Sequence, residues 1–182
     1  MCHLKIIRSI SLIISLFLIT SCSNNSAMKP EDFKDKEPRL IIEDYFLGNV
    51  KAWGILQNRS GKVTRQFSAD LNGSWDGKQL ILKEKFNWND GEIQNREWII
   101  NKIDENNYEG TAGDVVGKAI GYSYGPVFKF EYVLLVPVKG KEMKITFDDW
   151  IFKQDERVAI NKATMTKFGI KVAELTVVFV KD

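Results

Sequence analysis

The chain has 182 residues, with 26 Lys or Arg and 24 Asp or Glu, so its formal net charge at pH 7 is only +2. This near-neutral charge argues against a nucleic-acid partner, which would require a stripe of basic residues. The single histidine, His3, and both cysteines, Cys2 and Cys22, lie within the first 22 residues. If that segment is processed at Cys22, no imidazole or free thiol remains. Histidine-bearing zinc sites, thiolate nucleophiles and histidine-based triads are then excluded, and we expect no metal and no cofactor.

Residues 1–21 have the pattern of a cleaved signal peptide. Lys5 and Arg8 precede the apolar run 10–19, and small residues lead into Cys22. This resembles a bacterial lipobox, in which the cysteine is acylated and becomes the mature N-terminus. The alternatives are an ordinary secretory signal or a short membrane anchor, although the run is too short to span a bilayer comfortably. Ser23, rather than Asp, resembles an outer-membrane sorting signal, so we expect a lipid-anchored envelope protein of the outer membrane that faces the periplasm.

Processing would leave a chain of about 160 residues, which is enough for one domain with its own core. We expect residues 22–38 to form a lipidated tether and residues 39–182 to form a single β-barrel domain. No later apolar run reaches the roughly 20 residues of a transmembrane helix. The lipid on Cys22 would therefore be the membrane attachment of a monomeric protein.

From Val50 onward, β-branched and aromatic runs alternate with turn signals every 10 to 15 residues. No segment keeps a helical period, and the pattern predicts about nine or ten antiparallel strands. We expect an all-β, up-and-down meander that closes into a lipocalin-like barrel. A transmembrane barrel is disfavoured because Thr64, Gln66, Ser68 and Asp70, on one face of residues 63–75, could not contact hydrocarbon.

Turn lengths predict which side chains meet in the first hairpin. A two-residue Asp76-Gly77 loop would set Phe67 opposite Phe86 and Glu84 opposite Ala69, with matching buried faces. The same register would set Arg65 opposite Trp88, where its guanidinium group could stack on the indole.

The second turn requires three residues, Asn89-Asp90-Gly91, with Gly91 in the left-handed conformation. It would set Leu82 opposite Trp98 and Glu84 opposite Arg96, within salt-bridge reach. Further along, a two-residue Lys139-Gly140 loop would place Asp149 opposite Phe130.

The most distinctive constellation of candidate functional residues consists of three inward charges, Arg65, Glu84 and Arg96. Two arginines with one carboxylate would suit an anionic head group held between aromatic walls. The alternatives are a structural ion pair or triad, or charges near the barrel mouth that reach water. A fourth charge, Asp149, would neutralise the cluster. The predicted ligand-binding residues are Arg65, Phe67, Glu84, Phe86, Trp88, Arg96, Trp98, Tyr132 and Asp149.

Several short motifs together resemble the bacterial lipoprotein family catalogued as domain of unknown function 3833. They include Gly73-Ser74-Trp75-Asp76-Gly77, Asp114-Val115-Val116-Gly117, Phe147-Asp148-Asp149-Trp150 and Asn161-Lys162-Ala163. The resemblance implies an envelope lipoprotein with no established activity, whose genes are often grouped with lipid-modifying enzymes. It carries over no catalytic residue.

Three functions remain open at this point. The leading hypothesis is a carrier that binds a fatty acid or phospholipid inside the barrel and has no catalytic residues of its own. The second is an accessory lipoprotein that acts as a scaffold for a lipid-modifying partner enzyme in the envelope. The third is a lipid-modifying enzyme that uses Glu84 and Asp149 as acid and base.

Overall fold

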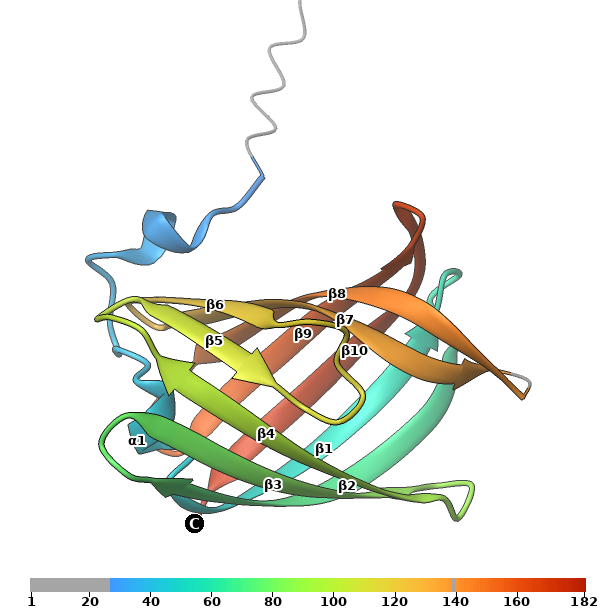
Figure 1. Cartoon of the computed structure of the whole chain (residues 1–182), viewed down its shortest axis with the longest axis horizontal. Helices are drawn as coiled ribbons and strands as arrows, with labels where there is room; N and C mark the ends of the chain where they lie inside the picture. The colour runs from blue at the N-terminus through green and yellow to red at the C-terminus, as the bar shows by residue number, and fades with distance from the viewer. Residues whose placement is uncertain (1–26, 139) are drawn as a thin grey trace, which may run out of the picture.

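The computed structural model describes residues 27–138 and 140–182, and these residues form a ten-stranded antiparallel barrel (Figure 1). The predicted signal peptide and Cys22 lie outside the described residues. Two short helices, η1 (Pro30–Phe33) and α1 (Ile42–Tyr45), precede the strands. The strands are β1 (Gly48–Asn58), β2 (Val63–Trp75), β3 (Gln79–Trp88), β4 (Ile93–Lys102), β5 (Asn107–Thr111), β6 (Ala119–Tyr124), β7 (Val127–Val138), β8 (Lys141–Lys153), β9 (Val158–Lys167) and β10 (Ile170–Lys181).

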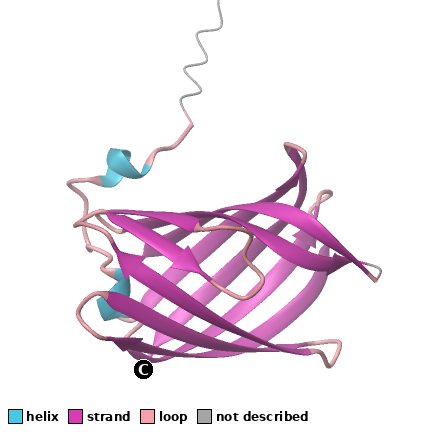
Figure 2. Ribbon diagram, in the orientation of Figure 1, coloured by secondary structure: helices cyan, strands magenta, loops and turns pink. Residues whose placement is uncertain are grey.

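Each strand pairs with its sequence neighbours, and β10 pairs with β1 to close the barrel. The predicted all-β, up-and-down meander is therefore confirmed, and Figure 2 shows how little of the chain is helical. Inward side chains alternate with outward ones along the strands, because successive residues of a strand point to opposite faces. No helix in the described part of the chain is long and apolar enough to cross a bilayer.

The second turn follows the predicted register, whereas the first does not. Gly91 has φ of +88°, and Glu84 pairs with Arg96 across β3 and β4. In the first hairpin, however, Trp75 pairs with Leu80, so the predicted register is wrong by two residues. The side chain of Asp76 accepts hydrogen bonds from the amides of Lys78 and Gln79, which makes Gly77-Lys78 the loop.

This shift changes which residues are opposite one another but not which face they occupy. Glu84 pairs with Leu71 rather than Ala69, and Phe67 pairs with Trp88 rather than Phe86. A slip of two residues keeps every side chain on its face, so hydrophobic alternation alone could not distinguish the two registers. The predicted pairing of Phe130 with Asp149 is confirmed.

One end of the barrel is closed by α1, whose apolar side chains enter the core. Ile42, Tyr45 and Phe46 are buried, and the Tyr45 hydroxyl donates to the carbonyl oxygen of Arg157 at 2.9 Å. Gly73 of β2 permits this packing, because a Cβ there would overlap the carbonyl oxygen of Phe46. The closed end therefore depends on a glycine near the end of β2.

The segment predicted to be a tether also contacts the barrel. Pro30 is buried, and the ring of Phe33 packs edge-on against Phe152 with 6.1 Å between centroids. The amide of Leu40 donates to the carbonyl oxygen of Gly125 at 2.7 Å. The described N-terminal residues thus lie at the same end of the barrel as α1 (Figure 1).

The opposite end of the barrel, which we call the mouth, is formed by the β1–β2, β3–β4, β7–β8 and β9–β10 turns (Figure 1). β5 and β6 are short, and β4 pairs with β5 only over residues 99–102. The 112–118 loop between them runs along β7 instead, where Val116 donates to Val133 and Leu135 donates to Asp114. Near the mouth, this loop, rather than a β-strand, forms this part of the barrel wall.

Candidate functional site

The barrel interior is not completely filled by side chains. A cavity of about 830 Å³ lies at the mouth, and a smaller one of about 100 Å³ lies deeper, toward α1. Phe67, Phe86, Arg96 and Tyr132 line both cavities and separate them. Pockets of about 300–1,000 Å³ with apolar walls and few polar groups are typical of small-molecule sites. The mouth cavity has the size of such a site.

All nine residues predicted to bind a ligand line one or both cavities. Arg65 and Trp88 line the mouth cavity, whereas Glu84, Trp98 and Asp149 line the deep one. Their role in binding therefore stays a prediction, while their position inside the barrel follows from strand alternation.

Arg96 forms the best-defined polar contact of the cavity wall, and its partner is Asp114. The guanidinium Nη2 lies 2.7 Å from Asp114 Oδ2, and Nε lies 3.2 Å from both carboxylate oxygens. A forked pair of this kind is stronger and more directional than a single contact. The predicted ion pair between Arg96 and Glu84 is therefore wrong, since the guanidinium group turns toward the 112–118 loop instead.

Glu84 faces the deep cavity and forms no ion pair with the described residues, while the neighbouring Trp98 favours its ionised form. Protein surrounds it, yet some of its surface stays accessible because it faces a void. Burial raises the pKa of Glu84 to about 7, against the opposing attraction of Arg96 and with a further rise from Asp149. Near neutral pH this carboxyl group is present in both forms, so it can either donate or accept a hydrogen bond.

Asp149 lies in a hydrogen-bonded group on the other side of the deep cavity. The Tyr132 hydroxyl donates to Asp149 Oδ2 at 2.9 Å, and the Asn161 amide donates to Oδ1 and to the Trp150 carbonyl oxygen. Burial raises the pKa of Asp149 to about 6, although both donors favour its ionised form. The same burial raises the pKa of Tyr132 well above its usual value, so its hydroxyl stays protonated.

Arg65 lies apart from Glu84 and Arg96, so the predicted three-charge constellation is wrong in this respect. Its guanidinium group binds two carboxylates of the β3–β4 turn, with Nη2 at 2.8 Å from Asp90 and Glu92. The guanidinium carbon lies 4.0 Å from the centre of the Trp88 ring, which confirms the predicted stacking. Arg65 therefore fixes this turn at the mouth.

The aromatic residues form two continuous walls between these polar groups. Phe67 contacts Phe86 and Trp88, with centroids 5.2 and 4.9 Å apart, although the shifted register changes their backbone pairing. Trp98 contacts Tyr132 at 5.2 Å, and Tyr132 stacks on Phe147 at 5.0 Å. Edge-on, tilted and stacked contacts at these distances are the arrangements that aromatic pairs favour.

The arginines are neutralised by nearby carboxylates, so the interior does not carry the net positive charge expected from Arg65, Glu84 and Arg96 alone. Asp114 offsets Arg96, and Asp90 with Glu92 offsets Arg65. Within residues 27–138 and 140–182, no group of three or more metal-ligating side chains comes together. The cavity thus offers apolar surface and a few hydrogen-bonding groups.

Asp114 and Asn161 were not among the residues predicted to bind a ligand. Asp114 belongs to a loop, and Asn161 is an inward residue of β9 whose outward neighbour Ile160 is apolar, so hydrophobic alternation does not mark it. Each does fall within a motif that carries the family resemblance, Asp114-Val115-Val116-Gly117 or Asn161-Lys162-Ala163. These two motifs were therefore the sequence features that could have identified Asp114 and Asn161.

A family model described as protein of unknown function (DUF3833) matches residues 16–181. No curated protein matches the chain in sequence. Among solved structures, a DUF3598-family protein of unknown function from Nostoc punctiforme aligns with a TM-score of 0.60 and 13% identity, over 81% of this chain and 51% of that one. The chain therefore spans about half the length of that protein.

An S-type phycobiliprotein lyase from Guillardia theta aligns with a TM-score of 0.55 and 9% identity, over 77% of this chain and 90% of the lyase. At these identities the two alignments show a shared barrel fold alone, because one fold can host unrelated functions.

Proposed function

The chain belongs to the DUF3833 family of unknown function, and on this premise we propose that it binds an amphipathic molecule inside its barrel. A fatty acid or a phospholipid acyl chain fits the chemistry best. The observation that carries the proposal is the mouth cavity of about 830 Å³, whose walls combine aromatic and aliphatic side chains with several charged and polar ones. The favourable term would be the removal of the apolar chain from water, about 25 cal/mol per Å².

The polar groups would hold the head of such a ligand by hydrogen bonds. Arg96 lines the boundary between the two cavities, and Glu84 beyond it can donate as well as accept near neutral pH. A carboxylic acid or phosphate ester presents oxygen atoms that suit these donors. Because Asp114 already binds Arg96, an anionic head would compete with this contact.

Co-purification tests this proposal directly. The full chain, purified from its host membranes, is extracted with organic solvent, and the extract is analysed by mass spectrometry for stoichiometric lipid. Val136→Trp, which would fill the mouth cavity, is expected to lose the lipid, whereas Val178→Trp on the exposed outer wall of β10 is expected to retain it. Absence of lipid from the wild-type chain in both detergent and native preparations would contradict the proposal.

A scaffold for a lipid-modifying enzyme is the alternative function, and it predicts a filled barrel. The cavity favours the carrier over this alternative. A lipid-modifying enzyme built on Glu84 and Asp149 would lose turnover in Glu84→Gln with the fold intact. A carrier would instead change its affinity for the ligand in the same variant.

The proposal also includes attachment to the bacterial envelope through a lipid on Cys22, with the barrel in the periplasm. Its support is the lipobox-like sequence before Cys22. Metabolic labelling with a clickable palmitate analogue is expected to label the wild-type chain but not Cys22→Ser. Equal labelling of both would overturn this assignment, and fractionation of the labelled cells would locate the protein between inner and outer membrane.

A further inference from the structure

The mouth of the barrel carries an unusual concentration of exposed apolar side chains. The rim, which we define as the four mouth turns and their flanking residues, contains five of the large hydrophobic residues exposed in the described part of the chain. Their exposed fractions are Val63 41%, Ile93 61%, Val138 38%, Phe168 92% and Ile170 55%. Scattered exposed hydrophobes need no explanation, but a cluster around one opening indicates an interaction surface.

Phe168 is the most exposed of these residues, and its backbone is held in an unfavourable conformation. Its φ is +51°, a region that non-glycine residues adopt only rarely, and Gly169 follows with φ of +75°. The turn thus projects the Phe168 ring outward from the tip of the β9–β10 hairpin. Nothing in the described residues covers this ring, apart from the Lys167 ammonium group 5.4 Å from its centre.

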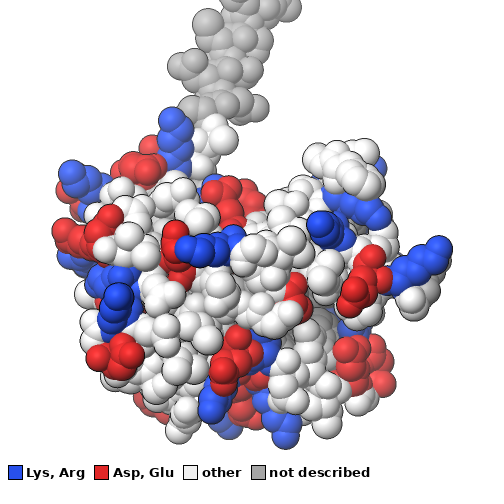
Figure 3. Space-filling view, viewed as in Figure 1, with Lys and Arg blue, Asp and Glu red and all other residues white. Residues whose placement is uncertain are grey.

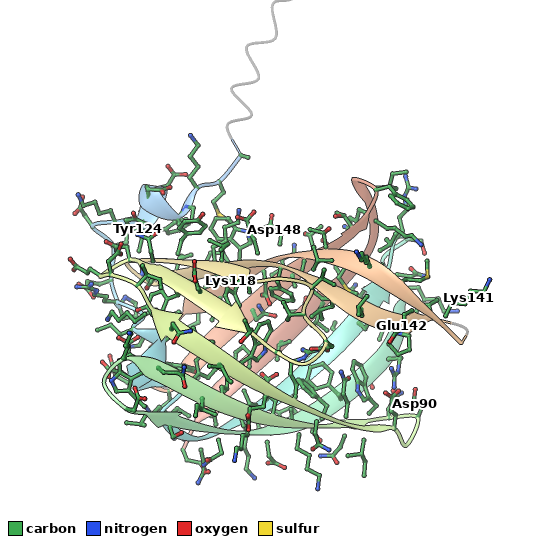
Figure 4. The ribbon with its side chains drawn as sticks, viewed as in Figure 1. Asp90, Lys118, Tyr124, Lys141, Glu142 and Asp148 are labelled. Carbon is green, nitrogen blue, oxygen red and sulfur yellow. The ribbon has the colours of Figure 1, made fainter. Side chains whose placement is uncertain are left out.

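Basic side chains lie among these apolar ones. Arg59, Lys62, Lys141 and Lys167 belong to the rim, and none of them is in ion-pair distance of a carboxylate in the described chain. Asp90 and Glu92 share Arg65, which offsets one of their two negative charges, and Glu174 is bound by Lys171 at 2.9 Å. Glu142 is the acidic residue that projects near Lys141 (Figure 4).

The rim therefore combines a net positive charge with protruding apolar groups, and Figure 3 shows both basic and acidic side chains at this end of the molecule. Apolar and aromatic side chains enter the head-group region of a bilayer, while lysine and arginine bind anionic lipid heads beside them. A protein partner would be expected to need a broad continuous patch, whereas these residues stand on separate hairpin tips. Separate tips suit a deformable lipid surface.

We propose that the rim docks the barrel, mouth first, onto the surface of a membrane that contains anionic lipids. The Phe168 hairpin would enter the head-group layer, and the neighbouring basic residues would bind the lipid phosphates. Docking would seal the mouth against the bilayer, so that an acyl chain could pass into the mouth cavity without crossing water. This last step rests on the proposed function, but the docking itself does not.

The end opposite the mouth carries α1 and the described start of the chain. A lipid anchor on Cys22 would attach to the barrel at that end, since η1 packs beside β6 and β7. Rim docking and N-terminal anchoring would thus use opposite ends of one barrel. This geometry allows a test in which the two modes of attachment are distinguished by position.

The experiment measures which end of the full chain contacts a bilayer. An environment-sensitive dye is attached at Lys141→Cys, in the rim, or at Lys78→Cys, in the β2–β3 turn of the opposite end, each in a Cys2→Ser, Cys22→Ser chain. Vesicles of phosphatidylcholine with phosphatidylglycerol are added, and quenching by bilayer-embedded nitroxide lipid is recorded. Quenching of the rim dye alone is expected. Equal quenching at both sites, or quenching at residue 78 alone, would overturn the proposal.

Matched substitutions identify the groups responsible. Ile93→Ser and Phe168→Ser in the rim are each expected to weaken vesicle binding about fivefold or more. Ile103→Ser, which removes an equally exposed isoleucine (57%) at the opposite end, should leave binding unchanged. Lys141→Glu with Lys167→Glu is expected to reduce affinity at least about tenfold on anionic vesicles and to have little effect on neutral ones. Equal losses in the rim variants and in Ile103→Ser would contradict the proposal.

A last comparison separates docking from ligand binding. Val136→Trp, with a blocked cavity, is expected to dock as the wild-type chain does, because its rim is unchanged. If the wild-type chain carries lipid but its rim dye is not quenched, docking is wrong and the proposed function stands. If the rim dye is quenched but no lipid is ever bound, docking stands and the carrier function is wrong.

Discussion

Arg96 faces Glu84 across the β3–β4 hairpin, yet its guanidinium group binds Asp114 of the 112–118 loop, with 2.7 Å between Nη2 and Oδ2. This contact fastens a loop to β4 at the place where β5 and β6 are too short to complete the wall. Glu84 is left facing the cavity without an ion-pair partner in the described chain. The pair therefore links the closure of the barrel wall to the chemistry of its interior.

Double-mutant cycles should separate the two interactions of Arg96. Arg96→Met combined with Asp114→Asn is expected to give a coupling energy of about 1–3 kcal/mol at both pH 5.5 and pH 8.5. Arg96→Met combined with Glu84→Gln should show little coupling at pH 5.5 and more at pH 8.5, because Glu84 ionises with a pKa of about 7. Urea unfolding of the single and double variants at each pH measures both coupling energies. A larger coupling to Glu84 at pH 5.5 would contradict this arrangement.

Glu84→Gln should stabilise the fold in a pH-dependent way. The pKa of Glu84 is about 7 in the folded protein, above its usual value of 4.5. The folded state therefore binds more protons than the unfolded state between these values, and stability falls as pH rises through this window. Glutamine removes that loss, so the variant should be about 1–3 kcal/mol more stable than wild type at pH 8 and nearly equal at pH 4.

The control for this variant is Glu97→Gln on the exposed outer face of β4, where Lys83 lies 3.8 Å away. It should change stability by less than about 0.5 kcal/mol at either pH. Parallel stability curves for wild type and Glu84→Gln would show that Glu84 is solvated as an ordinary surface carboxylate.

Tyr132→Phe should raise the pKa of Asp149 above its value of about 6. The Tyr132 hydroxyl donates to the Asp149 carboxylate at 2.9 Å and so favours its ionised form. The loss of one buried hydrogen bond to a charged group is also expected to cost about 1.5–3 kcal/mol of stability at pH 8. Carbon-13 NMR titration of the carboxyl groups measures the shift. An unchanged or lower pKa would contradict the assigned contact, and Tyr122→Phe, with its ring outside the cavity, is the control.

Gly73→Ala should destabilise the closed end of the barrel by about 2–4 kcal/mol. The added Cβ would overlap the carbonyl oxygen of Phe46, so either α1 or β2 must shift. Gly113→Ala is the matched control, since a Cβ there meets no atom within 4 Å and its change should stay near zero. Chemical unfolding of both variants measures these changes in stability. Equal stabilities would show that α1 packs less closely than described.

Much of this architecture could be predicted from residue types alone. The alternation in residues 63–75 and the glycines of the turns determined the strands, their inward faces and the barrel class. The pairing of Glu84 with Arg96 followed from the three-residue turn ending at Gly91, and the structure confirms it. These features are local, since a turn and a face depend on residues adjacent in the sequence.

The first hairpin shows where local rules stop being sufficient. Asp76-Gly77 and Gly77-Lys78 are both acceptable loops, and they preserve the same faces. The choice depends on the Asp76 side chain, which accepts two amides, and on the helix α1 packed against Gly73. Neither contact has a signature in alternation or composition.

By itself, the sequence determined the meander, its inward charges and the confinement of the histidine and both cysteines to the first 22 residues. The tertiary structure decided which carboxylate binds each arginine, because Asp114 and Arg96 are brought together by a loop that replaces missing strand. It also decided that the interior has space, at about 830 Å³ near the mouth. The volume of the cavity depends on how side chains from ten strands pack together, and no local sequence pattern encodes that packing.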